Sequence, residues 1–192
     1  MEGMRVVELA AVAFGVASVV LSIRQHIWCW PTGLVMVVLY IFIYYRTRLY
    51  SDMGLQVVYV ALQIYGWWHW LHGGRERGEL KVSRLSRAGA AGWLMVAVAG
   101  TAGLGHVMKT YTNADLPYGD AAPTVLSLIA QWLMAKKVLE SWWLWITVDV
   151  LYLGIYNYKA LYLTMGMYGL FLMLATSGWW EWRKTCLAPA AA

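Results

Sequence analysis

Long runs of apolar residues follow one another along almost the whole chain, with only short polar breaks between them. Each run is close to the roughly 17–25 residues that an α-helix needs to cross the hydrocarbon core of a bilayer. The runs are continuously apolar rather than alternating, which disfavours the strands of a membrane barrel. They predict seven transmembrane helices, at about 6–23, 28–45, 51–71, 88–107, 121–138, 141–158 and 161–180.

Two of these runs are copies of one another. Residues 49–70 read LYSDMGLQVVYVALQIYGWWHW, and residues 161–182 read LYLTMGMYGLFLMLATSGWWEW. Aligned without a gap, the two segments share nine identical residues in 22 positions, including the closing GWW-W. A duplicated membrane-spanning unit is typical of transporters, whose two halves face each other across a substrate path. The duplication therefore predicts a transporter.

The duplication extends upstream of the LY pair. Trp28-Cys29-Trp30 opens the second predicted span and Trp143-Leu144-Trp145 opens the sixth, so spans one to three correspond to spans five to seven. Each copy has an odd number of helices, and the fourth span, rich in Gly and Ala, restores the same orientation to both. We therefore expect an all-α polytopic membrane protein with two parallel three-helix repeats joined by a linking helix. The expected single membrane domain, 1–192, divides into repeat one at 5–72, a linker loop and helix at 73–120, repeat two at 121–184 and a short tail at 185–192.

The composition supports a membrane protein. The 192 residues are 61% hydrophobic and only 13% charged, whereas soluble domains average about 45–50% apolar and about 25% charged residues. The net charge of +5 would indicate nucleic-acid binding only if it formed a basic face on a folded soluble surface. The apolar spans leave little chain for such a surface, so no nucleic-acid partner is expected.

The positive charges instead predict an orientation in the bilayer, because Lys and Arg are enriched in cytoplasmic loops. If the N-terminus is outside, ten of the 15 Lys and Arg residues lie on the inner side, five of them within 75–87. The sequence therefore predicts an outside N-terminus and a cytoplasmic C-terminus. Both GWW-W clusters then fall at cytoplasmic helix ends, where indole rings favour the headgroup level. We expect most of these rings to form an aromatic belt.

Asp149 is the main candidate for function, because an aspartate halfway along a span costs about 2.5–3.5 kcal/mol to insert. Trp142, Trp145 and Asp149 are spaced by three and four residues, so they share one helical face. Two indoles in line with a carboxylate suit a flat, cationic heteroaromatic ligand. The carboxylate balances the charge of the ligand or accepts hydrogen bonds from its hydroxyl groups. The alternatives are an acid that pairs with a neighbouring helix or is protonated, and a belt position for Trp142.

The third span contributes a second polar face. Gln56, Tyr59, Gln63 and Trp67 are spaced by three, four and four residues, and amides buried in lipid must find hydrogen-bond partners. We expect these four side chains to bind substrate, unless both glutamines only bond neighbouring helices. The weaker candidates are Tyr152, Tyr156, Asn157 and Tyr168.

Other chemistry finds little support. The two cysteines, Cys29 and Cys186, lack metal-ligand spacing, and the four histidines form no midplane pair. A membrane enzyme would need a nucleophile–base pair or clustered His and carboxylates at one depth, and only Asp149 is deep. A seven-span photoreceptor would need a lysine within the last span, and Lys159 lies before it. No G-x-x-x-x-G-K-[ST] loop for ATP is present, and neither a metal nor another cofactor is expected.

The stretch from Trp28 to Trp70, the WWLWITVDV segment and the second LY–GWW-W resemble the PnuC family of vitamin transporters, best known for nicotinamide riboside. The likeness covers nearly the whole chain. It implies a three-plus-one-plus-three helix fold like that of the SWEET sugar transporters, a homotrimer, and facilitated diffusion followed by trapping through a cytoplasmic riboside kinase. By the same likeness, Trp142 and Trp145 match the tryptophans of a W-x-x-W-x-x-x-N type motif, and Gln56 matches a glutamine before the YGWW.

Asp149 stands where that motif has asparagine. An acid suits nicotinamide riboside, whose pyridinium is cationic, and equally suits thiamine, another cationic heteroaromatic that relatives are reported to carry. Riboflavin is larger and neutral, so it is less favoured. We expect uptake of nicotinamide riboside for NAD salvage across a bacterial inner membrane, with thiamine or riboflavin as alternatives. In the expected alternating-access cycle, one three-helix unit rocks against the other while the ring is held near Asp149.

Overall fold

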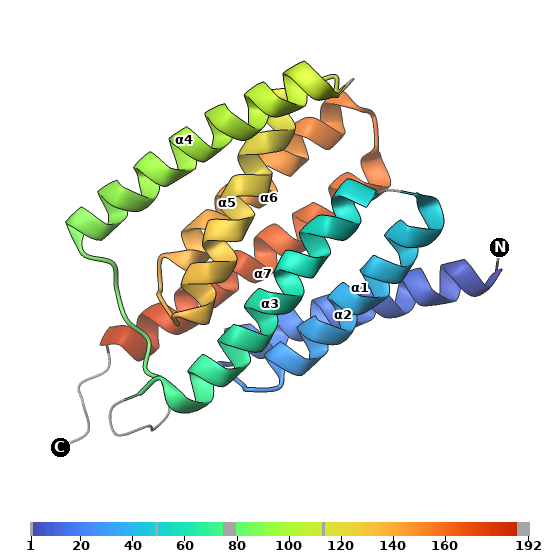
Figure 1. Cartoon of the computed structure of the whole chain (residues 1–192). Helices are drawn as coiled ribbons and strands as arrows, with labels where there is room; N and C mark the ends of the chain where they lie inside the picture. The colour runs from blue at the N-terminus through green and yellow to red at the C-terminus, as the bar shows by residue number, and fades with distance from the viewer. Residues whose placement is uncertain (1, 49, 75–79, 113, 188–192) are drawn as a thin grey trace. The chain divides into compact units, whose positions relative to one another are not determined.

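The computed structural model of the chain describes residues 2–48, 50–74, 80–112 and 114–187. These ranges contain no strand, only an isolated bridge between Ser83 and Val138. Figure 1 shows the seven helices of this described part: α1 (Glu2–Ile23), α2 (Cys29–Thr47), α3 (Tyr50–His72), α4 (Arg87–Tyr111), α5 (Pro117–Ala135), α6 (Ser141–Tyr158) and α7 (Tyr162–Leu187). The predicted number and order of helices are confirmed. The bounds differ most at α7, which continues to Leu187 rather than ending near residue 180.

Three of the described helices are long and apolar enough to cross a membrane by length and composition alone: Gly3–Ile23, Cys29–Thr47 and Arg87–Tyr111. The other four are 18 to 26 residues long and do not reach that hydropathy. Tryptophan and tyrosine make up much of α3, α6 and α7. These side chains score lower than aliphatic ones on hydropathy scales, although membrane interfaces favour them.

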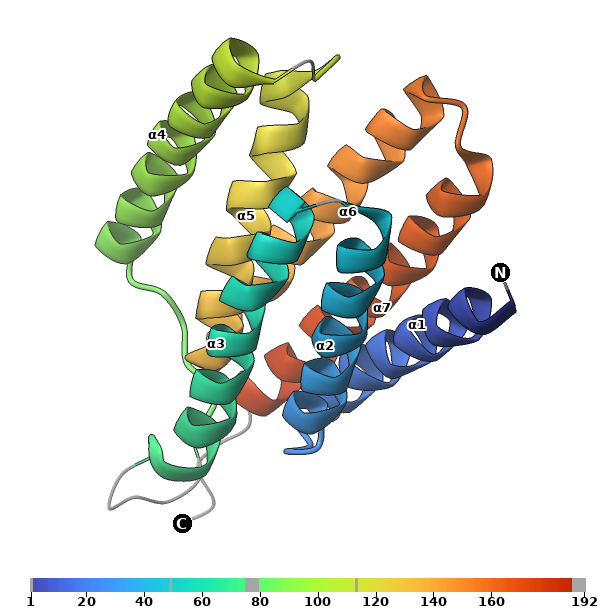
Figure 2. The same cartoon turned by 45° about the vertical axis from the view of Figure 1, so that its right-hand side comes forward.

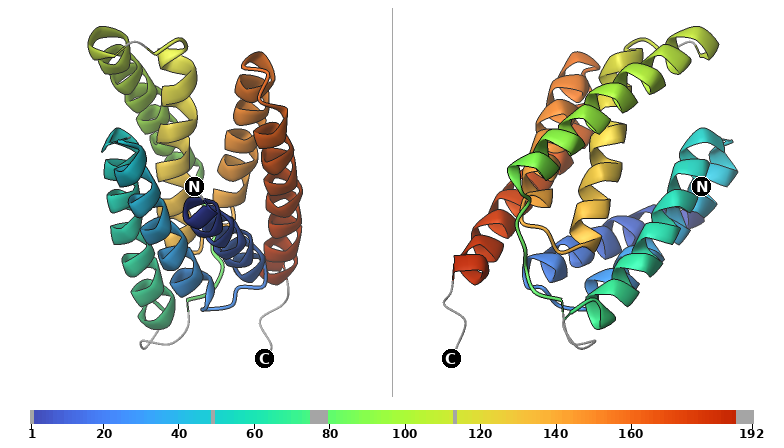
Figure 3. Two further views of the ribbon diagram at one scale, coloured as in Figure 1. Left: turned by 90° about the vertical axis from the view of Figure 1, so that its right-hand side faces the viewer. Right: turned by 60° about the vertical axis from the view of Figure 1, so that its left-hand side comes forward.

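The helices form two compact units. The first unit contains α1, α2 and α3, with residues 135–137 at the end of α5. Within it, α2 packs against both α1 and α3 (Figures 1 and 2). The second unit contains α4, the rest of α5, α6 and α7. Within it, α6 and α7 lie side by side (Figure 3), and a small apolar cluster that includes Ala97 and Ile129 joins α4 to α5.

The backbone repeats with an offset of 112 residues. Gln25 and Lys137, which follow α1 and α5, have φ of 55° and 53°, and Arg48 and Ala160, which follow α2 and α6, have φ of 60° and 54°. The members of each pair are 112 positions apart. Left-handed backbone at a residue with a side chain is uncommon, so its recurrence at matched positions is a strong sign of duplication. The predicted correspondence of α1–α3 with α5–α7 is confirmed.

The hydrogen bonds of the turns fix the register of the two copies. The His26 N–H donates to the Leu21 carbonyl at 2.9 Å, and the Val138 N–H donates to the Leu133 carbonyl at 3.0 Å, again 112 positions on. This register pairs Trp30 with Trp142. The correspondence of the two Trp-x-Trp motifs expected from the sequence is therefore wrong by three residues, because local tryptophan spacing resembles a match that the turn lengths do not allow.

A tryptophan packed against a glycine joins the second and third helices of the first repeat. The six-membered ring of Trp30 on α2 occupies the space that a side chain at Gly66 of α3 would need. The same ring stands edge-on against Trp70, with ring centroids 5.3 Å apart and planes at 84°, a favoured aromatic geometry. The indole Nε1 of Trp30 is buried without a hydrogen-bond partner in the described residues, so the contact rests on packing alone.

The second repeat has the same contact. A Cβ built on Gly178 of α7 would lie 2.5 Å from Cη2 of Trp142 on α6. The Trp142 ring stands edge-on against Trp182, with centroids 5.5 Å apart and planes at 88°. Its Nε1 is also buried without a partner among the described residues. The repeat therefore preserves the close approach of two helices, and not only their sequence signature.

The expectation of an aromatic belt is wrong for the last tryptophan of each GWW-W cluster. Trp70 is 3% exposed, whereas its neighbour Trp68 is 58% exposed. In the second cluster Trp182 is fully buried and Trp180 is exposed. The buried ring comes four residues after the glycine, on the same helical face, so it packs with the glycine into the repeat.

We expect Gly66→Ala and Gly178→Ala to lower the melting temperature of the purified protein, because the added methyl group would overlap a buried indole ring. Overpacking of this kind costs about 1–3 kcal/mol. The matched controls are Gly54→Ala and Gly166→Ala on the same two helices, where an added Cβ meets nothing within 4 Å. Alanine is the better helix former there, so a fall as large in the controls would contradict the contact.

Candidate functional site

Asp149 is buried in the middle of α6, in the second unit. The residue is 5% exposed, and no basic side chain pairs with it in the part of the chain that the structure describes. It interacts electrostatically with Tyr168 of α7. A buried carboxylate carries a large desolvation cost unless an opposite charge compensates it. The position therefore favours a cationic ligand or a protonated acid.

The two candidate tryptophans of α6 have different surroundings. Trp145 is half-buried, and it lies one helical turn before Asp149. Trp142 is enclosed by Gly178 and Trp182. The geometry favours stacking on a ligand for Trp145 and a packing role for Trp142. That both rings bind substrate stays a prediction.

Two tyrosines of α6 and one of α7 form a ring cluster in the second unit. The rings of Tyr152 and Tyr168 lie 4.5 Å apart, and the Tyr156 ring lies 5.2 Å from that of Tyr168. Asp149, Tyr152 and Tyr156 are spaced by three and four residues, so the acid and the cluster share a face. Of the weaker sequence candidates, only Asn157 stands apart, and it is exposed.

The four candidates on α3 lie in the first unit and differ in exposure. Gln63 is buried, Gln56 and Tyr59 are half-buried, and Trp67 is 38% exposed. The amide of Gln63 lies against Gly33 of α2, and no hydrogen bond to it forms within the described residues. The seven predicted residues therefore form two sets: three on α6 in the second unit and four on α3 in the first.

Four buried polar side chains among the described residues were not expected from the sequence: Ser127, Gln131, Lys137 and Ser141. Gln131 of α5 is buried in the second unit, and the signal that could have found it is an amide in the middle of the predicted span 121–138. Lys137, which the sequence treats only as a topology charge, is buried with its Nζ 4.6 Å from the centroid of the Trp70 ring. A cation over an indole face is stabilised by the ring quadrupole.

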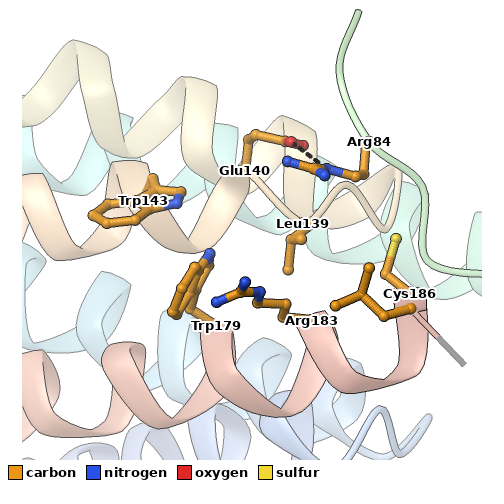
Figure 4. A pocket seen from close by; sticks show the side chains of 8 residues that line it. Arg84, Leu139, Glu140, Trp143, Trp179, Arg183 and Cys186 are labelled. Carbon is orange, nitrogen blue, oxygen red and sulfur yellow. Dashed lines mark hydrogen bonds and ion pairs between the residues drawn. The ribbon is translucent and has the colours of Figure 1, made fainter.

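A cavity of about 260 Å³ lies in the second unit, where the start of α6 meets the end of α7 (Figure 4). On one side Glu140 accepts a hydrogen bond from Arg84 Nε at 3.3 Å, and on the other the Arg183 guanidinium lies 5.1 Å from the centroid of Trp179. The remaining lining residues are Leu139, Trp143, Cys186 and Leu187. None of the seven candidates lines this cavity. Among the described residues, no three His, Cys, Asp or Glu side chains gather to hold a metal ion.

A sequence profile of the family described as nicotinamide mononucleotide transporter matches residues 5–184, nearly the whole chain. The chain belongs to this family. The nicotinamide mononucleotide transporter family consists of membrane transporters, so the protein is a multi-pass membrane transporter. The predictions of a transporter rather than an enzyme, and of a PnuC-like chain, are confirmed.

The chain is similar to relatives that are named as transporters of two different vitamins. The nicotinamide riboside transporter PnuC of Escherichia coli is 26% identical over 92% of this chain and 84% of its own. PnuC of Neisseria mucosa is 30% identical over 92% of this chain and 72% of its own. The riboflavin/roseoflavin transporter RibM of Streptomyces davaonensis is 28% identical over 86% and 80%. The crystal structure of the vitamin B3 transporter PnuC matches with a TM-score of 0.73 at 26% identity, covering 92% of this chain and 80% of that one.

We expect Trp142→Ala to destabilise the protein by about 3–5 kcal/mol, because it empties a large buried site, and Trp142→Phe to lose much less. The control is Trp143→Ala, since Trp143 is exposed. Thermal unfolding measured by light scattering would report all three variants. Equal stability of Trp142→Ala and Trp143→Ala would contradict the packing role of Trp142.

Proposed function

We propose that this protein takes up nicotinamide riboside by facilitated diffusion, through an alternating-access cycle. Its relatives in Escherichia coli and Neisseria mucosa are named nicotinamide riboside transporters. The relative in Streptomyces davaonensis is named a riboflavin/roseoflavin transporter, so family membership by itself leaves the vitamin open. The choice rests on the site.

The observation that carries the proposal is the buried, unpaired Asp149. Nicotinamide riboside has a cationic pyridinium ring, whereas riboflavin is neutral. A carboxylate that is 5% exposed and has no basic partner in the described residues is costly without a positive charge nearby. A cationic substrate supplies that charge, and a neutral one does not.

In this proposal the substrate ring stacks on Trp145, and Asp149 balances its charge or accepts hydrogen bonds from its ribose hydroxyls. Trp142 supports the face from behind through its contact with Trp182. The proposed contacts from α3 are Gln56, Tyr59, Gln63 and Trp67, of which Gln63 is the most buried. The polar hydroxyls of the tyrosine cluster beside Asp149 offer further partners for a riboside.

The proposed cellular setting is a bacterial inner membrane, with the N-terminus outside and the C-terminus in the cytoplasm. The two-to-one distribution of Lys and Arg between the loops supports this orientation. Phosphorylation of the transported riboside by a cytoplasmic kinase would trap it in the cell and so drive net uptake without an ion gradient. The proposed pathway is NAD salvage. We also propose a homotrimer, on the likeness to the PnuC family.

Thiamine is the second candidate substrate, favoured by the same observation. It is also a cationic heteroaromatic, so Asp149 and Trp145 suit it by the same physical argument. It lacks the ribose hydroxyls that a carboxylate and three tyrosines would bind.

A binding titration separates these candidates. We expect nicotinamide riboside to raise the melting temperature of the purified protein and to bind by calorimetry, since a ligand that binds only the folded state stabilises it by mass action. Thiamine and riboflavin are measured beside it at the same concentrations. Selective stabilisation by thiamine would move the function to thiamine uptake, and selective stabilisation by riboflavin would refute the argument from Asp149.

Substitutions at Asp149 test its role directly. We expect Asp149→Ala to abolish uptake of labelled nicotinamide riboside at matched expression. Asp149→Asn should keep only part of it, because the amide still accepts the hydroxyl hydrogen bonds but no longer balances the charge of the pyridinium ring. The control is Trp68→Ala, an exposed ring, which should leave uptake nearly unchanged. Loss of uptake in Trp68→Ala to the extent seen in Asp149→Ala would sink the site assignment.

A further inference from the structure

The cavity between the start of α6 and the end of α7 takes no part in the proposed substrate site, because none of the candidate residues lines it. Its lining combines two arginines and one glutamate with two tryptophans and two leucines (Figure 4). The charged side chains leave one positive charge in surplus. A basic and partly aromatic pocket between membrane helices suits an anionic group that carries an apolar part.

The packing that the two repeats share does not require these charges. At the 112-residue offset, Glu140 corresponds to Trp28, and Arg183 corresponds to Leu71. The first repeat therefore has no charged residue at either position, although it has the same tryptophan–glycine contact. Charges that the common fold does not need indicate a role that belongs to the second repeat alone.

Arg183 is a cation without an acidic partner among the described residues. Its guanidinium carbon lies 5.1 Å from the centroid of the Trp179 ring and 5.7 Å from that of Trp180. The rings hold the group in place, while its N–H donors, which lie in the guanidinium plane, stay available to an acceptor. The neighbouring Lys184, in contrast, pairs with Glu181 at 3.1 Å.

Arg84 lies on another side of the cavity, in the segment that precedes α4, and its position is fixed. Its Nε donates to Oε1 of Glu140 at 3.3 Å, and the backbone N–H of Leu85 donates to Oε2 of the same carboxylate at 3.0 Å. Beside this pair, the Leu139 N–H donates to the Ser83 carbonyl at 2.9 Å. Both oxygens of the glutamate are therefore engaged, and the Nη groups of Arg84 remain for another acceptor in the described part of the chain.

The apolar rim favours a lipid as the source of the anion. Trp143 and Leu187 of the lining and the adjacent Trp180 are 52%, 65% and 53% exposed, and indoles at helix ends favour the headgroup level of a bilayer. In the predicted orientation this end of both helices is cytoplasmic, where the leaflet carries anionic lipids. A lipid buries these apolar side chains under its glycerol and acyl groups, whereas a free phosphate compound gains nothing from them.

We propose that this cavity binds the phosphate group of an anionic phospholipid. Arg183 and the Nη groups of Arg84 donate to the phosphate oxygens, which match the planar guanidinium fork. Trp143 and Leu187 contact the glycerol and the first acyl carbons. Glu140 positions Arg84 and does not touch the lipid. The bound lipid joins the segment before α4 to the end of α7, within the second unit.

Cys186 provides a readout at the cavity itself, because it belongs to the lining. The other cysteine, Cys29, is 2% exposed, and a Cys29→Ala background leaves a single thiol. The rate of alkylation by N-ethylmaleimide is measured on the purified protein in detergent with added phosphatidylglycerol. At a lipid concentration ten times its Kd, we expect alkylation to slow about tenfold, because the thiol reacts only in the empty cavity. Phosphatidylcholine, which has no net charge, should change the rate less than about twofold.

Substitution of Arg183 tests the phosphate contact. Arg183→Gln should weaken lipid binding about tenfold, through loss of a charge-assisted hydrogen bond, and Arg183→Lys should fall between, because it keeps the charge without the fork. The matched control is Lys184→Gln, which removes the same charge from a neighbouring residue that is paired with Glu181 and does not line the cavity. It should bind lipid as the unsubstituted protein does. The melting temperature without added lipid shows that each variant is folded.

Two soluble ligands distinguish the lipid from its phosphate. Glycerol 3-phosphate and inorganic phosphate carry the acidic group without acyl chains, so they should leave the alkylation rate of Cys186 unchanged at the concentrations where the lipid protects. Equal protection by either of them would overturn the lipid assignment. Absence of protection by phosphatidylglycerol, or equal loss of protection in Arg183→Gln and Lys184→Gln, would overturn the site itself.

Discussion

The contact between an indole ring and a glycine backbone sets the separation of the second and third helices in each repeat. Trp30 meets Gly66, and Trp142 meets Gly178, at positions that match under the internal offset. Interiors are packed closely enough that one extra carbon atom is felt. Gln63 is three residues from Gly66, and Trp145 is three residues from Trp142, so both lie one turn from this contact. The placement of these two candidates therefore depends on a purely apolar interaction.

The sequence predicts the fold well because its strongest signals are long. Seven apolar runs and a 22-residue duplication survive errors of a few residues at each boundary, and they lead to the order of helices and to the family. The burial of Asp149 and Gln63 is also predictable, since a polar side chain in an apolar span is visible without coordinates. What such a pattern does not contain is the face on which each tryptophan packs.

That gap explains the particular errors. Trp68 and Trp70 are two residues apart and chemically identical, yet one is exposed and the other is buried against Trp30. An indole suits a headgroup region and a protein core equally well, so composition assigns both to a belt. For the same reason, the sequence pairs the Trp-x-Trp motif at residues 28–30 with the one at 143–145, which is three residues away from the register of the turns. The sequence predicts Lys137 only as a loop charge, because no sequence pattern shows that its ammonium group lies over the ring of Trp70.

The left-handed residues that close the α2–α3 and α6–α7 hairpins have a mechanical consequence. Arg48 and Ala160 hold φ of 60° and 54° without the freedom that glycine would bring. Each hairpin is also pinned near its other end by an indole against a glycine. A pair of helices fixed at both ends behaves as one stiff lever rather than as two rods on a hinge. We therefore expect the movement that a transport cycle requires to occur between such helix pairs rather than within them.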